Sequence, residues 1–165
     1  MNNSLTKNDI LCHVANELIA NRVSVATGES CTGGLLSSVL TDIPGSSAYF
    51  LGGVTSYSNE AKITLLGVDT KTIEEYGAVS KETALEMVKG IEKIFRSDIS
   101  VAVTGIAGPG GSTSVKPVGL VFISFASKGS YVVKEFNFVG NRSEIKEQTV
   151  RAALIGIKEI LTGTS

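Results

Sequence analysis

The sequence has almost none of the residues on which the commonest hydrolytic and metal sites depend. Its 165 residues include one histidine, His13, two cysteines and no tryptophan. His13 lies beside the apolar stripe of an expected packing helix, which favours a structural role for this histidine. A Ser/His/Asp or Cys/His triad is therefore not expected. Cys12 and Cys31 lack CxxC or Cys/His spacing, so neither a zinc site nor a disulfide framework is indicated. We expect no metal and no cofactor.

Charge imbalance and long hydrophobic runs are also missing. Fifteen Lys and Arg residues against sixteen Asp and Glu give a net charge of −1, which supplies no field for nucleic acid or a membrane surface. No apolar run approaches the roughly 18 residues of a membrane span, and the first residues do not resemble a signal peptide. We therefore expect a cytoplasmic protein. Neither GxxxxGK[ST] nor GxGxxG follows an expected strand, so the P-loop and the standard dinucleotide fold lack their signatures.

The hydrophobic pattern predicts strands that alternate with helices. Helical stripes and capping residues predict helices over 6–21, 32–41, 59–66, 80–95 and 141–161. Apolar runs predict strands over 22–27, 50–58, 99–104, 118–126 and 131–139, the last two joined by a hairpin at Lys128 and Gly129. This order favours a single α/β domain over residues 1–165, a three-layer α/β/α sandwich on a mixed, mostly parallel sheet of about five strands.

Three polar segments fall at the ends of expected strands: GESCTGG, SYSNEAK and TGIAGPGG. Sites in such folds are usually built from loops at the carboxyl ends of strands, so we expect these segments to share one pocket. Without a histidine, Ser30 of the first segment needs another base. Lys62 can serve if burial or the positive end of a helix removes its proton, and Tyr57 could relay that proton. Amides from Thr32 to Gly34 are candidates for an oxyanion hole.

Each of these residues also has a structural interpretation. A serine at the start of a helix is most often an N-cap, and Cys31 is the size of a buried core residue. Lys62 beside Glu60 fits a solvated surface position, and Tyr57 fits a side chain that points into the core. Arg142 is electrostatically misplaced near a helix start, which favours an anion-binding role.

Six segments in this order resemble the CinA C-terminal domain family: GESCTGG, PGSSAYFLGGVTSYSNEAKITLLGV, GAVSKETA, VAVTGIAGPGG, KPVGLVFISF and FVGNRSEIKEQTV. The resemblance covers residues 23–161. It implies a nicotinamide-nucleotide amidohydrolase that converts nicotinamide mononucleotide (NMN) to nicotinic acid mononucleotide and ammonia, in pyridine-nucleotide salvage. It also implies a homo-oligomer.

The family's functional residues fall on residues of the same type here. The resemblance implies catalytic roles for Ser30, Lys62 and Tyr57, and it places the family's threonine on Thr104 and its arginine on Arg142. Combined with the loop analysis, the expected substrate contacts are Thr32, Gly33, Gly34, Thr104, Gly105, Gly108 and Arg142. We expect attack by Ser30 on the amide carbonyl after Lys62 accepts the serine proton, directly or through Tyr57.

Three other interpretations stay open at the level of sequence. The pocket could bind a nucleotide without turning it over, or it could hydrolyse a different amide, because pocket shape decides between related substrates. A Tyr/Lys oxidoreductase is disfavoured, because the tyrosine and lysine are five positions apart and no GxGxxG opens the chain.

Overall fold

The computed structural model describes residues 6–163, which form one five-stranded sheet with helices on both faces. The strand order is β2-β1-β3-β4-β5, with bounds β1 Val25–Glu29, β2 Phe50–Thr55, β3 Ile99–Gly105, β4 Leu120–Ser127 and β5 Ser130–Asn137. β1 pairs in parallel with β2 and β3, whereas β4 and β5 are antiparallel to their neighbours. The carboxyl ends of β2, β1 and β3 therefore meet at one edge of the sheet.

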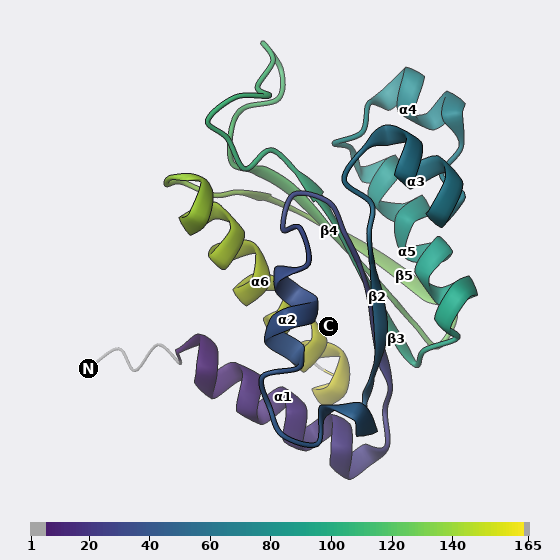
Figure 1. The fold of residues 1–165 in the computed structure, drawn as a ribbon, viewed down its shortest axis with the longest axis vertical. Helices are drawn as coiled ribbons and strands as arrows, with labels where there is room; N and C mark the ends of the chain where they lie inside the picture. The colour runs from purple at the N-terminus through teal and green to yellow at the C-terminus, as the bar shows by residue number, and fades with distance from the viewer. Residues whose placement is uncertain (1–5, 164–165) are drawn as a thin grey trace.

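The helices divide between the two faces of the sheet (Figure 1). One face carries α1 (Lys7–Asn21), α2 (Leu35–Leu40) and α6 (Arg142–Thr162); the other carries α3 (Asn59–Leu66), α4 (Thr70–Tyr76) and α5 (Lys81–Phe95). A short 3-10 turn, Ser46–Ala48, precedes β2. The predicted three-layer α/β/α sandwich on a mixed sheet of about five strands is confirmed.

Polar caps and glycines fix where most of these elements begin and end. Side chains of Thr6, Ser58, Asp69, Ser80 and Asn141 accept amide hydrogen bonds at the starts of α1, α3, α4, α5 and α6. Such caps satisfy amides that have no partner inside a helix. At the hairpin between β4 and β5, Lys128 and Gly129 have φ angles of 50° and 76°, as a tight two-residue turn requires.

The sheet is buried at its centre and open at its edges. Every residue of β1 is buried, as are the first six of β3 and the first seven of β4, whereas residues of β2 alternate between half-buried and exposed. The larger apolar core lies under α1, α2 and α6, and a smaller one lies under α3 and α5. The central strands therefore form a rigid base for the loops at their carboxyl ends.

The boundaries differ from the sequence prediction at the segment that carries Ser30. β1 runs to Glu29 rather than ending at residue 27, and α2 begins at Leu35 rather than at residue 32. Gly33 and Gly34 have φ angles of 64° and 96°, which a helix cannot include, so residues 30–34 form a turn instead. The expected strands 50–58 and 131–139 are shorter than predicted, and the sequence pattern did not predict α4.

Candidate active site

Ser30 lies directly after β1, where backbone hydrogen bonds from both neighbouring strands hold the chain. Its amide donates to the carbonyl of Val103 in β3 at 3.0 Å, and the carbonyl of Glu29 accepts from the amide of Ser56 after β2 at 2.8 Å. The Ser30 side chain is 7% exposed. The strand ends therefore fix the backbone on both sides of this hydroxyl.

Lys62 reaches Ser30 from α3, which follows β2. Its Nζ lies 2.9 Å from Ser30 Oγ and donates to the carbonyl of Ser56 at 3.0 Å. The side chain is 2% exposed, and in the described part of the chain no carboxylate pairs with it. Burial lowers the pKa of Lys62 below its ordinary 10.5, against a smaller opposing effect of Cys31. Lys62 thus sits beside a hydroxyl in surroundings that favour its neutral, basic form.

Cys31, the neighbour of Ser30 in the sequence, is also buried. Burial is the largest cause that raises the pKa of its thiol to about 12, and the charge of Glu29 adds to the effect. A thiol with this pKa is almost entirely protonated near neutral pH. Of the two adjacent side chains, Ser30 is the one with a base at hydrogen-bond distance.

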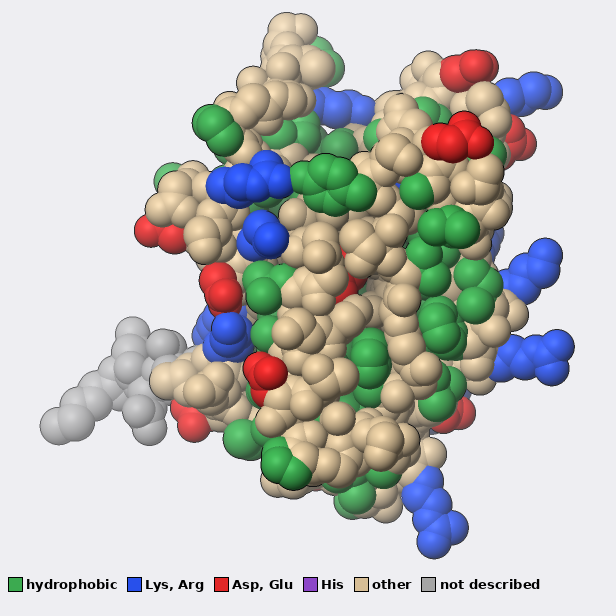
Figure 2. All heavy atoms as spheres, viewed as in Figure 1, with side chains coloured by type: hydrophobic (Ala, Val, Ile, Leu, Met, Phe, Trp, Pro, Cys, Tyr) green, Lys and Arg blue, Asp and Glu red, His purple; other side chains and the backbone are tan. Residues whose placement is uncertain are grey.

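A cavity of about 270 Å³ opens at this point. The lining residues are Ser30, Cys31, Tyr57, Asn59, Lys62, Ala78, Val79, Thr104, Gly105, Ile106, Ala107, Gly108, Gly110, Gly111 and Arg142. Figures 1 and 2 show the loop between β3 and β4 and the region of α4 rising as two lobes with a notch between them. All three predicted loops therefore contribute to one pocket at the carboxyl edge of the sheet.

Arg142 and Tyr57 form the rim of this cavity. One Arg142 nitrogen, Nη1, donates to the carbonyl of Gly108 at 2.7 Å, and the other, Nη2, donates to the hydroxyl of Tyr57. Tyr57 is 58% exposed, and its hydroxyl is paired with the guanidinium while Ser30 and Lys62 meet directly. Of the two proton routes in the hypothesis, the geometry favours the direct one.

Thr104 and the glycine-rich loop form another wall. Thr104 is fully buried, and its hydroxyl donates to the carbonyl of Ala78 at 2.7 Å. This bond joins the end of β3 to the turn before α5. Gly105 and Gly108 line the cavity as expected.

The expected contacts from Thr32, Gly33 and Gly34 are placed differently. None of the three lines the cavity; the Gly33 amide donates to the carbonyl of Ser30, and the Gly34 amide donates to the Glu29 carboxylate. Both amides are therefore committed within the turn. Among the described residues, the Thr32 amide has no hydrogen-bond partner and its buried hydroxyl has none either. Thr32 is the member of this set that remains free to donate.

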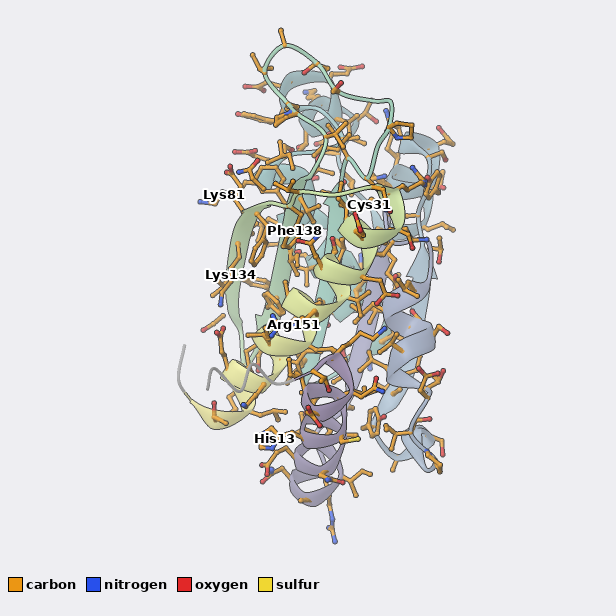
Figure 3. All side chains as sticks on the ribbon, turned by 90° about the vertical axis from the view of Figure 1, so that its left-hand side faces the viewer. His13, Cys31, Lys81, Lys134, Phe138 and Arg151 are labelled. Atoms are coloured by element: carbon orange, nitrogen blue, oxygen red, sulfur yellow. The ribbon has the colours of Figure 1, made fainter. Side chains whose placement is uncertain are left out.

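One further residue supports the site from outside the cavity. Glu29, which the sequence analysis did not single out, is 1% exposed and accepts several of the turn's hydrogen bonds; its signal is a carboxylate just before a serine and a glycine pair. His13 lies on α1, well below Cys31 in the view of Figure 3 and apart from it. Among the described residues, no cluster of three or more His, Cys, Asp or Glu side chains could hold a metal. In the same range no helix is long and apolar enough to cross a membrane.

Known proteins resemble this chain over most of its length. A CinA-like protein of Syntrophomonas wolfei subsp. wolfei is 51% identical over 148 residues, which cover 89% of this chain and 36% of that protein. A CinA-like protein of Endomicrobium trichonymphae is also 51% identical over 148 residues, which cover 89% of this chain and 35% of that protein. The chain thus spans about a third of the length of these curated relatives.

Solved structures agree with these matches. The competence/damage inducible protein CihA from Agrobacterium tumefaciens superposes with a TM-score of 0.89 at 40% identity, covering 94% of this chain and 99% of that one. A competence-damaged protein (CinA) superfamily protein from Klebsiella pneumoniae superposes with a TM-score of 0.92 at 32% identity, covering 96% and 99%. The family model described as the CinA C-terminal domain matches residues 7–161. The chain therefore belongs to the CinA C-terminal domain family.

Proposed function

We propose that this chain is an amidohydrolase that cleaves the carboxamide of nicotinamide mononucleotide and releases nicotinic acid mononucleotide and ammonia. One observation carries the proposal: a buried lysine amine, which has no carboxylate partner among residues 6–163, lies 2.9 Å from a serine hydroxyl at the wall of a cavity. A neutral amine at that distance is a general base for the hydroxyl. The substrate comes from the sequence resemblance, and the relatives' names state none.

The first half of the reaction forms an ester. Neutral Lys62 takes the proton of Ser30, and Ser30 Oγ adds to the amide carbonyl of the substrate. The tetrahedral intermediate then collapses as the C–N bond breaks. The ammonium of Lys62 gives its proton to the departing nitrogen, so ammonia leaves and Lys62 is neutral again. The product of this half is an acyl ester on Ser30.

The second half consumes water. Lys62 takes a proton from a water molecule as the water oxygen adds to the ester carbonyl, and it returns that proton to Ser30 Oγ as the ester bond breaks. The net reaction adds one water to one amide and yields one carboxylic acid and one ammonia. We assign the oxyanion in both halves to a backbone amide of the turn after Ser30, in which Cys31 is the residue that lines the cavity.

The nucleotide part of the substrate needs an anion site, which the rim of the cavity offers. Arg142 carries a positive charge at the mouth, held by Gly108 and Tyr57. A guanidinium forms strong, charge-assisted hydrogen bonds with phosphate. We assign Arg142 and the glycine-rich loop from Gly105 to the phosphate and ribose, and Thr104 to holding that wall in place.

The test measures ammonia and the acid product together. The purified chain is incubated with equal concentrations of NMN, free nicotinamide or the dinucleotide, and products are separated by chromatography. We expect NMN to be turned over. Ser30→Ala and Lys62→Met should each lower the rate by at least about 10³-fold, as for groups that act as a unit.

The matched control is Ser100→Ala, which removes a buried hydroxyl at the amino end of β3. It should keep the wild-type rate. Full activity of Ser30→Ala would refute the nucleophile. Thermal stabilisation by NMN without ammonia would favour a binding module instead, and turnover of nicotinamide alone would favour another amide substrate.

A further inference from the structure

We propose that Glu29 is a positioning residue for the nucleophile: its buried carboxylate closes the turn after β1 and thereby holds Ser30 Oγ at hydrogen-bond distance from Lys62 Nζ. The inference rests on the proposed function for the identity of the substrate and for the role of Ser30 as the nucleophile. It concerns a residue that touches neither the cavity nor Lys62, and therefore acts through the chain on either side of it.

The carboxylate accepts four hydrogen bonds from the segment that follows Ser30. Oε2 accepts from the amides of Gly34 and Leu36 at 3.1 and 3.0 Å, and Oε1 accepts from the amide and the hydroxyl of Ser37 at 2.7 and 2.6 Å. All four partners are donors, so both oxygens of Glu29 act only as acceptors, as the two oxygens of a carboxylate do. Glu29 thus ties the first turn of α2 back to the end of β1.

The turn cannot supply this cap from its own residues. Gly34 occupies the N-cap position of α2 with a φ of 96°, and glycine has no side chain that could accept an amide hydrogen bond. A Ser, Asp or Asn would normally provide the acceptor there. Glu29 provides it from five residues upstream. Ser30 lies inside the loop that this contact closes, so the cap and the position of the nucleophile are coupled.

The backbone of Glu29 is tied to the other half of the dyad. Its carbonyl accepts from the amide of Ser56 at 2.8 Å, and the carbonyl of Ser56 accepts from Lys62 Nζ at 3.0 Å. One residue therefore connects the turn that carries Ser30 to the acceptor that orients Lys62. A shift of Glu29 would change the distance between the two reacting atoms from both sides.

The hydrogen-bond network of the Glu29 carboxylate extends through the hydroxyl of Ser37 to the hydroxyl of Thr27. Thr27 Oγ1 lies 2.7 Å from Ser37 Oγ, and because the Ser37 hydrogen points to Glu29, Thr27 is the donor of that pair. A Cβ on Gly53 of β2 would lie 2.3 Å from Thr27 Oγ1 and 2.6 Å from Ser37 Oγ. Glycine at 53 therefore leaves room for this chain, which extends the network from Glu29 across to the edge strand.

The negative charge of Glu29 indicates that this residue affects the reaction rate through the position of Ser30 and not through its own electric field. A carboxylate near Ser30 opposes negative charge there, as its effect on the Cys31 thiol shows. Placed so, it does not stabilise an oxyanion by its own field. What it adds is the fixed position of the hydroxyl, and a displacement of about 1 Å in a catalytic group can cost about 100-fold in rate.

The test compares Glu29→Gln with Glu86→Gln. Glu86 accepts from the amide of Asp69 and the hydroxyl of Thr72, both at 2.7 Å, so it also ties a helix start, that of α4, to its surroundings, but away from Ser30. Both substitutions keep the side chain's size and replace one acceptor oxygen by a donor. We expect Glu29→Gln to lower kcat for NMN by about 100-fold with KM changed by less than about threefold. Glu86→Gln should keep kcat.

Two further readouts do not depend on the natural substrate. A fluorophosphonate, which reacts with activated serines, should label Ser30 of the Glu29→Gln variant much more slowly than that of the wild type. In a crystal structure of the variant, the distance between Ser30 Oγ and Lys62 Nζ should exceed hydrogen-bond range. If the wild type fails to hydrolyse NMN, the proposed function fails, yet the crystallographic distance still decides the role of Glu29.

A milder variant covers the case in which Glu29→Gln does not fold. Ser37→Ala removes one of the four contacts, and we expect about a tenfold loss in kcat, since one positioning hydrogen bond is lost. Wild-type kcat in both the Glu29→Gln and Ser37→Ala variants, or an unchanged Ser30–Lys62 distance in the first, would overturn the proposal. Equal losses of kcat in Glu29→Gln and Glu86→Gln would do the same.

Discussion

Replacing Lys62 by methionine should change how the stability of the protein depends on pH, because the folded state buries an amine that the unfolded state exposes. Lys62 is 2% exposed, and burial lowers its pKa in the folded protein below 10.5. Between these two pKa values the unfolded chain carries a proton on Lys62 that the folded chain lacks. Unfolding then takes up a proton, so the free energy of unfolding rises with pH.

The magnitude follows from linkage. As the pH falls from 10.5 towards the folded-state pKa, the wild type should lose about 1.4 kcal/mol of stability per pH unit from this group. Below the folded-state pKa both states are protonated and the loss stops. Methionine binds no proton, so the difference in stability between the wild type and Lys62→Met isolates the titration of Lys62. The lost bonds to Ser30 and Ser56 contribute a constant offset.

The assay is urea denaturation of both proteins between about pH 6 and pH 11, since two-state unfolding gives the free energy at each pH. The difference in the free energy of unfolding should change with pH between the folded-state pKa and 10.5 and become flat below the folded-state pKa. The pH of this bend should coincide with the acidic limb of kcat/KM, which reports the free enzyme. Lys81→Met is the control, because Lys81 is an exposed lysine at the start of α5 (Figure 3). A flat difference for Lys62→Met over the whole range would refute the reasoning, since the amine would then stay protonated in the fold.

Four further outcomes are expected. Cys31→Ala should keep most of the activity. In the wild type, Cys31 should resist iodoacetamide at pH 8, because burial raises the pKa of its thiol to about 12. Rapid labelling at Cys31 would contradict this. Arg142→Gln should raise KM for NMN by about 10- to 100-fold through the lost charged hydrogen bond, and an unchanged KM would exclude Arg142 from substrate binding. Gly90→Ala should lower the free energy of unfolding by about 1–3 kcal/mol, as urea denaturation would measure, because the new Cβ would lie 2.1 Å from the carbonyl of Leu66. Sedimentation equilibrium should give a multiple of the 17.2 kDa chain mass, as the resemblance implies for a homo-oligomer, and a monomer at all concentrations would reject it.

The sequence is sufficient to predict where each polar loop lies along the chain, but not which loops come together in space. Apolar runs predicted each strand, and the polar segments after residues 27, 55 and 103 lie at one edge of the sheet because β2, β1 and β3 are parallel. That Ser30 and Lys62 touch depends on β1 and β2 being neighbours. Hydrophobic periodicity indicates which residues are buried, and it contains no information on which strands pair.

The features that sequence reasoning missed share a physical cause. α4 has no buried residue, so it lacks the apolar stripe by which a helix is recognised. The shift of the α2 start to Leu35 depends on left-handed backbone at two glycines, which the sequence permits without requiring. The commitment of the Gly34 amide to Glu29 follows from that turn. Without the turn's geometry, the amides at 33 and 34 looked available for an oxyanion.

Glu29 and Lys62, two of the buried ionisable side chains near Ser30, differ in how many hydrogen bonds the fold supplies to them, and this difference supports the proposed role of Lys62 as the base. Glu29 has four donors at 2.6 to 3.1 Å, so its acceptor capacity is used and its position is fixed. Lys62 has two neutral oxygens at 2.9 and 3.0 Å, which leave the third hydrogen of an ammonium without a partner among the described residues. A buried charge that is incompletely satisfied is costly, and this cost lowers the pKa of Lys62 below its ordinary value. The same shortage of acceptors that destabilises the ammonium supports the proposal that Lys62 takes a proton from Ser30 and returns it within one catalytic cycle.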